Sequence, residues 1–122
     1  MKSLPILCAL ALCMSSTFAA DVPADAKNAS DKLVTALLDS DYDAFVANGD
    51  AAFKGLKKEQ FEAVCKQLSP RFKGGYEVTW LGELKQKGYA VSLWKFTFKD
   101  GGDDLLGTLS LKDGKIGGFW IK

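Results

Sequence analysis

Large apolar and polar residues alternate with a period of two through much of the second half of the chain, and this pattern constrains the fold most. Four such runs follow Gly75, over residues 76–81, 93–98, 105–111 and 116–121. Successive side chains of a β-strand point to opposite faces of a sheet, so each run predicts a strand with one buried face. Turn-forming residues separate the runs, which predicts an antiparallel meander of four strands.

The turns between these runs predict the register of the sheet. Asp113-Gly114 is typical of a two-residue type I′ turn, Gly101-Gly102 can centre the preceding turn, and residues 86–88 can form a three-residue loop. The pairs that these turns predict, from the last hairpin to the first, are Leu111–Ile116, Leu109–Gly118 and Gly107–Trp120; Phe98–Leu105, Phe96–Gly107 and Trp94–Leu109; and Trp80–Trp94, Val78–Phe96 and Tyr76–Phe98.

All three turns place the large apolar residues on the same face of the sheet. In this register Trp94, Phe96 and Trp120 point toward the helices, whereas Lys95 and Phe119 point away. A slip of one residue at any turn would move the apolar side chains of a strand to the other face.

The first half of the chain has helical periodicity. In residues 24–39 the apolar side chains Ala29, Leu33, Ala36 and Leu37 fall on one stripe of a helix. Ser40 is the predicted N-cap of a short helix over residues 41–47, and a third helix is expected over about residues 57–68, ended by Ser69-Pro70. Helices followed by strands predict an α+β fold, with N-terminal helices packed on a four-stranded antiparallel meander.

The first residues have the anatomy of a secretory signal peptide. Lys2 supplies a basic start, residues 6–14 an apolar core, and Thr17-Phe18-Ala19 a cleavage site. The apolar run is shorter than the about 20 residues that a membrane span needs. The sequence therefore predicts a signal peptide over residues 1–19, no membrane span, and one periplasmic or secreted domain over residues 20–122.

Composition excludes several classes of function. The chain contains no histidine, which excludes histidine-based triads and removes the commonest metal ligand. Without residues 1–19, which hold one lysine, 15 basic and 15 acidic side chains remain, so no nucleic-acid partner is expected. Residues 20–50 have a net charge of −5 and residues 51–75 a net charge of +4. This asymmetry fits either a dipolar docking surface or two solvated helix faces.

No residue pattern points to catalysis, a metal or a cofactor. Cys65 is the only cysteine after the signal peptide, and it lies on an apolar helical stripe, so we expect a buried structural thiol. The acidic pairs Asp41/Asp43 and Asp103-Asp104 lie at helix starts or turns, where aspartate is common. The glycine pairs Gly101-Gly102 and Gly117-Gly118 lack the strand–loop–helix setting of a phosphate-binding loop.

Aromatic side chains crowd the predicted inner face of the sheet. In the predicted register Gly82 and Ser92 lie opposite each other on this face, beside Trp80 and Trp94. Small residues beside indoles predict either a ligand pocket or a filled core. The pocket would be bounded by Trp80, Trp94, Gly82 and Ser92 and closed by Phe45 and Phe61.

Several segments also resemble a known family. They are Ala29 to Asp39, Asp41-Tyr42-x-x-Phe45, Glu59-Gln60-Phe61, Gly88-Tyr89, Phe96-x-Phe98 and Asp113-Gly114-Lys115-Ile116-x-Gly118-Phe119. Over nearly all of residues 26–121 the chain is similar to domain-of-unknown-function family 3887, in the nuclear transport factor 2-like superfamily. The resemblance implies a cystatin-like or nuclear transport factor 2-like cone, a curved sheet wrapped around helices and often hollow. It implies no reaction, and Lys57 departs from the Ser or Thr expected at a helix start.

Three classes of function remain. The first is an exported, non-enzymatic binding module that holds a small apolar or amphipathic ligand in the cone. The second is a protein–protein module, forming a homodimer or recognising an envelope protein or toxin through the outer sheet face, with Leu93, Leu106, Phe119 and Ile121 as candidate contacts. The third is an enzyme, and the fold alone does not choose among them.

Overall fold

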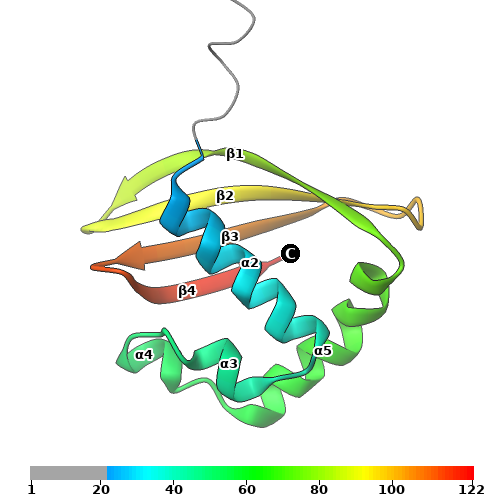
Figure 1. Ribbon diagram of the computed structural model, residues 1–122, viewed down its shortest axis with the longest axis horizontal. Coiled ribbons are helices and arrows are strands. Elements are labelled where there is room, and N and C mark those ends of the chain that lie inside the picture. Colours follow the sequence, from blue (N-terminus) through cyan, green and yellow to red (C-terminus); the bar gives the residue numbers. More distant parts are fainter. Residues whose placement is uncertain (1–21) are drawn as a thin grey trace, which may run out of the picture.

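A computed structural model describes residues 22–122 and has helices followed by a sheet, an α+β arrangement (Figure 1). The predicted signal peptide lies outside the described residues. The elements are, in chain order, α2 (Ala24–Leu38), α3 (Tyr42–Val46), α4 (Ala51–Lys54), α5 (Lys58–Lys73), β1 (Tyr76–Gln86), β2 (Tyr89–Phe98), β3 (Leu105–Lys112) and β4 (Lys115–Ile121). None of the helices in this part of the chain is long and apolar enough to span a membrane.

The four strands form one antiparallel sheet in the order β1-β2-β3-β4, which confirms the predicted meander. The sheet is curled but does not close into a barrel, so β1 and β4 are its edges. Helix α2 crosses one face of the sheet, α3 and α4 lie beyond the β4 edge in the view of Figure 1, and α5 runs from there to the start of β1. Helix α4 contacts β4, α2 contacts β3 and α5 contacts β1, so the helical layer reaches from one edge of the sheet to the other.

The short helices are capped by aspartate side chains. Asp41 caps α3, with its Oδ1 accepting a hydrogen bond from the Ala44 N–H at 3.1 Å, so the prediction of Ser40 as the cap is wrong. Helix α4 is not among the predicted elements, and Asp50 caps it by accepting from the Phe53 N–H at 2.9 Å. A side-chain oxygen at this position satisfies an N–H group that has no partner within the helix.

Helix α5 runs past the predicted stop. Pro70 lies inside the helix, which continues to Lys73, so the prediction that Ser69-Pro70 ends it is wrong. The last turn is held by tertiary packing, because Phe72 is buried against the rings of Phe96 and Phe98, at centroid distances of 5.3 and 5.1 Å. Burial of this aromatic side chain stabilises a turn in which proline removes one hydrogen bond.

The first hairpin has the predicted pairs but a different turn. The confirmed pairs are Tyr76–Phe98, Val78–Phe96 and Trp80–Trp94. The chain reverses over two residues, Lys87 and Gly88, which have positive φ angles of 53° and 84°. The predicted loop had three residues, so the observed turn is one residue shorter. The additional unpaired residue is Leu81, which forms a β-bulge within β1. Side chains of β1 that follow Leu81 therefore lie on the opposite face from the predicted one.

The middle hairpin is shifted by two residues from the prediction. The observed pairs are Phe96–Leu105, Trp94–Gly107 and Ser92–Leu109. The connection spans residues 99–104, and Asp100 shapes it by accepting the Gly102 N–H at 2.7 Å. A shift of two residues leaves every side chain on its predicted face, because the side-chain period of a strand is two.

The last hairpin contains a bulge that the sequence analysis missed. Its turn is as predicted and it pairs Leu111 with Ile116, but Gly117 is then left unpaired. Beyond Gly117, Phe119 lies opposite Leu109, so the predicted pairs Leu109–Gly118 and Gly107–Trp120 are wrong. The faces of β4 are consequently reversed: Phe119 packs against the core, and the side chain of Trp120 points outward with 56% exposure.

The bulge follows from the size of glycine. An ideal Cβ on Gly117 would lie 2.5 Å from the Tyr89 ring, so no side chain fits there without displacing this ring. On the same outer face an ideal Cβ on Gly118 would lie 2.1 Å from the Trp120 indole. Two aromatic side chains thus occupy the space where Cβ atoms of this glycine pair would lie.

The core lies between the helices and the inner face of β2 and β3. Its most deeply buried apolar side chains are those of Leu33, Leu37, Phe61, Phe96 and Leu109. Lys95, between two inward-facing residues of β2, is exposed as predicted. This core fixes the position of α3, α4 and α5 relative to β4, and the candidate site lies there.

Candidate binding cleft beside strand β4

The structure does not assemble the predicted pocket around Gly82 and Ser92. Because of the bulge at Leu81, Gly82 pairs with Leu93 and Ser92 pairs with Glu83. An ideal Cβ on Gly82 would meet no atom within 4 Å, so this glycine borders open space on the outer face. The prediction that Gly82 and Ser92 face each other is therefore wrong.

The other residues of the predicted pocket are separated into two groups. Trp80, Trp94 and Ser92 lie on the inner face, and their indole N–H groups and hydroxyl have no hydrogen-bond partner within residues 22–122. Phe45 and Phe61 lie elsewhere, in the wall of a cleft beside the edge strand. None of Trp80, Gly82, Ser92 and Trp94 lines this cleft.

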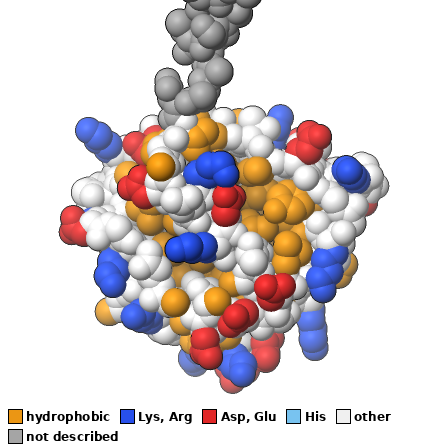
Figure 2. Space-filling model, in the orientation of Figure 1, with side chains coloured by type: hydrophobic (Ala, Val, Ile, Leu, Met, Phe, Trp, Pro, Cys, Tyr) orange, Lys and Arg blue, Asp and Glu red, His pale blue; other side chains and the backbone are white. Residues whose placement is uncertain are grey.

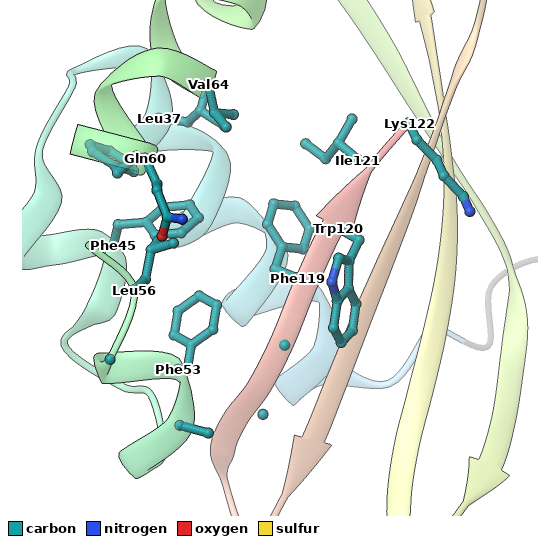
Figure 3. Close-up of a pocket in the computed structure, with 15 residues that line it drawn as sticks. Leu37, Phe45, Phe53, Leu56, Gln60, Val64, Phe119, Trp120, Ile121 and Lys122 are labelled. Carbon is teal, nitrogen blue, oxygen red and sulfur yellow. The ribbon is translucent and has the colours of Figure 1, made fainter. Parts of the chain in front are cut away.

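The cleft, called the β4 cleft below, lies between β4 and the helices α3, α4 and α5 (Figure 3). Its volume is about 550 Å³. Its lining residues are mostly apolar: Leu37, Phe45, Ala52, Phe53, Gly55, Leu56, Gln60, Phe61, Val64, Gly117, Gly118, Phe119, Trp120, Ile121 and Lys122. In Figure 3 the rings of Phe53 and Phe119 lie on opposite sides of the cleft.

One short contact between the chain before α4 and the start of β4 determines where the cleft begins. The Asp50 N–H donates to the Ile116 carbonyl at 2.9 Å, and the Ile116 N–H donates to the Asn48 carbonyl at 2.9 Å. The Asn48 amide also donates to the Gly114 carbonyl at 2.9 Å. Beyond Ile116 the two segments diverge, and the cleft opens between them.

Aromatic packing forms the inner wall of the β4 cleft. Phe45 packs against Phe53, Phe61 and Phe119, with ring centroids 5.5, 4.8 and 6.3 Å away. The Tyr42 hydroxyl donates to the carbonyl of Leu56 and so holds the loop between α4 and α5 in place. These contacts make the wall rigid and apolar.

The β4 cleft offers almost no reactive chemistry. Its lining residues carry three polar side-chain groups, those of Gln60 and Lys122 and the indole N–H of Trp120, and the Gln60 Oε1 accepts the Lys57 N–H at 3.4 Å. Figure 3 shows the Lys122 side chain directed away from the cleft. The arrangement can bury an apolar group, with one amide available to a polar end.

Cys65 lies in the core, as predicted, with 3% exposure. Burial raises the pKa of its thiol, a hydrogen bond with Ser40 lowers that pKa, and the nearby Glu62 carboxylate raises it. The net direction is upward, so the nucleophilic thiolate is disfavoured. Among the described residues no group of three His, Cys, Asp or Glu side chains could hold a metal ion.

The outer sheet face differs from the predicted interface at two of its four residues. Leu93 and Leu106 lie on this face, but Phe119 and Ile121 are wrong because the Gly117 bulge turns them toward the core. Trp120 takes their place on the outer face. On the opposite side, around α2, Figure 2 shows acidic and basic side chains interspersed, with apolar side chains exposed between them.

Most of the cleft was not visible in the sequence analysis. Two signals were available: Asp50 followed three residues later by a buried phenylalanine, which is typical of a capped helix, and the glycine pair inside a strand, which is typical of a bulge. Together they would have placed α4 and turned Phe119 inward.

Comparison of the chain with protein-family models and with curated proteins finds no match. The resemblance to domain-of-unknown-function family 3887 therefore stays a prediction.

Proposed function

We propose that the protein is a non-enzymatic binding module that takes an apolar or amphipathic ligand into the β4 cleft. The volume of about 550 Å³ lies within the range of small-molecule sites, roughly 300–1,000 Å³. The observation that supports this proposal most strongly is the composition of the cleft wall. Aromatic and aliphatic side chains form most of the wall, and the Gln60 side chain provides its one amide group. Such a wall binds apolar groups by removing them from water.

Two further parts of the proposal rest on the sequence. The signal-like segment over residues 1–19 supports a periplasmic or secreted location. The resemblance to the nuclear transport factor 2-like superfamily, whose cones are often hollow, supports a ligand-holding role for the curled sheet and its helices.

The proposal is tested by titrating the protein with dodecanoate, a single-chain amphiphile, and following backbone amide signals by NMR. We expect saturable shifts at Phe53, Val64 and Phe119, which line the β4 cleft. Val64 is 43% exposed, so Val64→Trp can fill the cleft without disturbing the core, and it should weaken binding at least tenfold.

Ala63→Trp is the matched control for this experiment. Ala63 is exposed on the same helix but does not line the cleft, so this variant should bind dodecanoate like the wild type. Equal binding by the wild type and Val64→Trp, or shifts confined to other surfaces, would contradict the proposal.

A second candidate is a protein–protein module that uses the outer sheet face. The observation that favours it is the Trp120 indole, which is 56% exposed on the same outer face as the exposed Leu106 of the neighbouring strand. An exposed indole is typical of interface centres. Light scattering over a range of protein concentrations detects self-association through this face, and Trp120→Lys should abolish it.

A further inference from the structure

Strand β4 presents free backbone groups along the β4 cleft. Leu106 and Lys122 exchange both of their backbone hydrogen bonds, at 2.8 and 3.0 Å. In an antiparallel pair such bonded positions recur at every second residue, so Trp120 also directs its N–H and C=O toward β3. The N–H and C=O groups of Phe119 and Ile121 therefore point away from the sheet.

These outward groups have no backbone partner within residues 22–122. The segment before α4 pairs only with Ile116, through Asn48 and Asp50, and diverges from β4 afterwards. Phe119 and Ile121 thus leave two N–H and two C=O groups free at the sheet edge. A row of such groups is a template for one more strand.

The free backbone edge and the apolar cleft coincide. The side chains of Phe119 and Ile121 line the β4 cleft, and their backbone groups border it. A lipid chain would fill the apolar space but leave the edge groups bonded only to water. An extended peptide satisfies both features, because its backbone pairs with the edge and alternate side chains enter the cleft.

Charge on the surrounding surface favours an acidic peptide. Exposed lysines stand on the helical side of the cleft, at positions 54, 57 and 58, and at both ends of β4, at Lys115 and Lys122. The helices that border the cleft also carry carboxylates, at Asp41, Asp43, Asp50, Glu59 and Glu62, but residues 51–75, which hold α4 and α5, have a net charge of +4. The excess of positive charge attracts acidic side chains next to the apolar ones.

We propose that the occupant of the β4 cleft is an extended segment of a partner protein, apolar at alternate positions and flanked by acidic residues. It adds a fifth strand to the sheet through Phe119 and Ile121. This inference rests on the proposed function and names the class of its ligand. A second copy of β4 fits less well, because antiparallel pairing of two such strands would bring the lysines at their ends together.

The test uses the acetylated and amidated peptide Glu-Val-Thr-Val-Thr-Val-Glu, with binding measured by calorimetry. In antiparallel pairing the valines enter the cleft and their N–H groups bond to β4, whereas the threonine N–H groups point away. We expect N-methylation of two valines to weaken binding at least tenfold and N-methylation of both threonines to change it less than threefold. Replacement of both glutamates by glutamine should also weaken binding and reduce its dependence on salt.

Two variants of the protein test the same backbone pairing by changing strand β4 instead of the peptide. Ile121→Pro removes the free N–H of Ile121 without removing a bond to β3 and should weaken peptide binding at least threefold. Ile121→Val keeps this N–H and should weaken peptide binding less than Ile121→Pro does. Thermal unfolding of each variant checks that the sheet is intact.

The outcomes separate the two proposals. If dodecanoate binds but the peptide does not, or both N-methylated peptides bind equally, the peptide inference is overturned and the proposed function stands. If neither probe binds, the proposed function fails as well. Concentration-dependent dimers that Ile121→Pro abolishes would show that a second copy, rather than a partner segment, occupies the edge.

Discussion

At the scale of single residues, Cys65 shows how burial decides reactivity. Its side chain is buried, and desolvation is the largest influence on the pKa of its thiol, which is raised. A raised pKa in the folded state means that formation of the thiolate favours unfolding. The free energy of unfolding is then constant below the ordinary thiol pKa of 9.0 and decreases as the pH rises through the raised value.

We expect Cys65→Ala to lower the free energy of unfolding by about 1 kcal/mol at neutral pH, because a small cavity replaces the sulfur. This difference should shrink at alkaline pH, since the variant has no thiol to ionise. Urea unfolding of both proteins at several pH values measures it. Rapid labelling of Cys65 in the native chain from Ala20 onward, where it is the only thiol, would show instead that it is accessible.

At the scale of strands, both bulges consist of one extra residue that reverses the faces beyond it. The period of two predicted the strands and their order, and it placed Phe96 inward and Lys95 outward. It could not place Leu81 and Gly117, because an extra residue depends on contacts between strands. At Gly117 the deciding contact is with the Tyr89 ring on β2, far away in sequence.

The faces of β4 give a direct test of this bulge. Phe119→Ala should lower the free energy of unfolding by about 2 kcal/mol or more, because the ring packs against the core beside Phe45. Trp120→Ala should cost less than about 1 kcal/mol, because the indole is mostly exposed. Chemical unfolding measures the free energy of unfolding of both variants. A larger decrease for Trp120→Ala than for Phe119→Ala would contradict the bulge at Gly117 and support the register predicted without it.

The candidate site was predicted less completely than the fold for the same reason. Phe45 and Phe61 were predicted as ligand contacts, and both line the β4 cleft. Their expected partners Trp80 and Trp94 form the predicted pair but do not line this cleft, and the bulge at Leu81 turns Gly82 to the outer face. Helical and strand periodicity therefore identified the buried residues. The β4 cleft, in contrast, depends on helix α4 and on the bulge at Gly117, and periodicity predicted neither.

At the scale of the whole molecule, one side chain joins the helical layer to the far end of the sheet. Arg71, near the end of α5, donates to both carboxylate oxygens of Asp100, at 2.9 and 3.2 Å, and to the Asp103 carbonyl at 2.7 Å. Its guanidinium also lies 4.1 Å from the centroid of the Phe98 ring. Together these contacts fix the connection between β2 and β3 against α5.

Arg71→Met removes the positive charge but keeps an unbranched side chain over Phe98. The variant therefore tests the polar contacts of Arg71 with Asp100 and with the Asp103 carbonyl. The hydrogen bond from Arg71 holds the pKa of Asp100 below its ordinary value of 3.8. A lowered pKa stabilises the fold above 3.8, and this contribution is lost as the pH falls through the lowered value. We therefore expect the variant to melt at a lower temperature than the wild type at neutral pH, with the difference decreasing in acid.

Lys73→Met is the control for Arg71→Met, because it removes an equal charge from the same helix outside this contact. Its melting temperature should stay close to that of the wild type, and the difference should change little with pH. Hydrogen exchange adds a local measurement, since the Gly102 N–H donates to Asp100 at 2.7 Å. Faster exchange at Gly102 in Arg71→Met alone would show that Arg71 orders this connection; equal exchange in both variants would show that Asp100 orders it unaided.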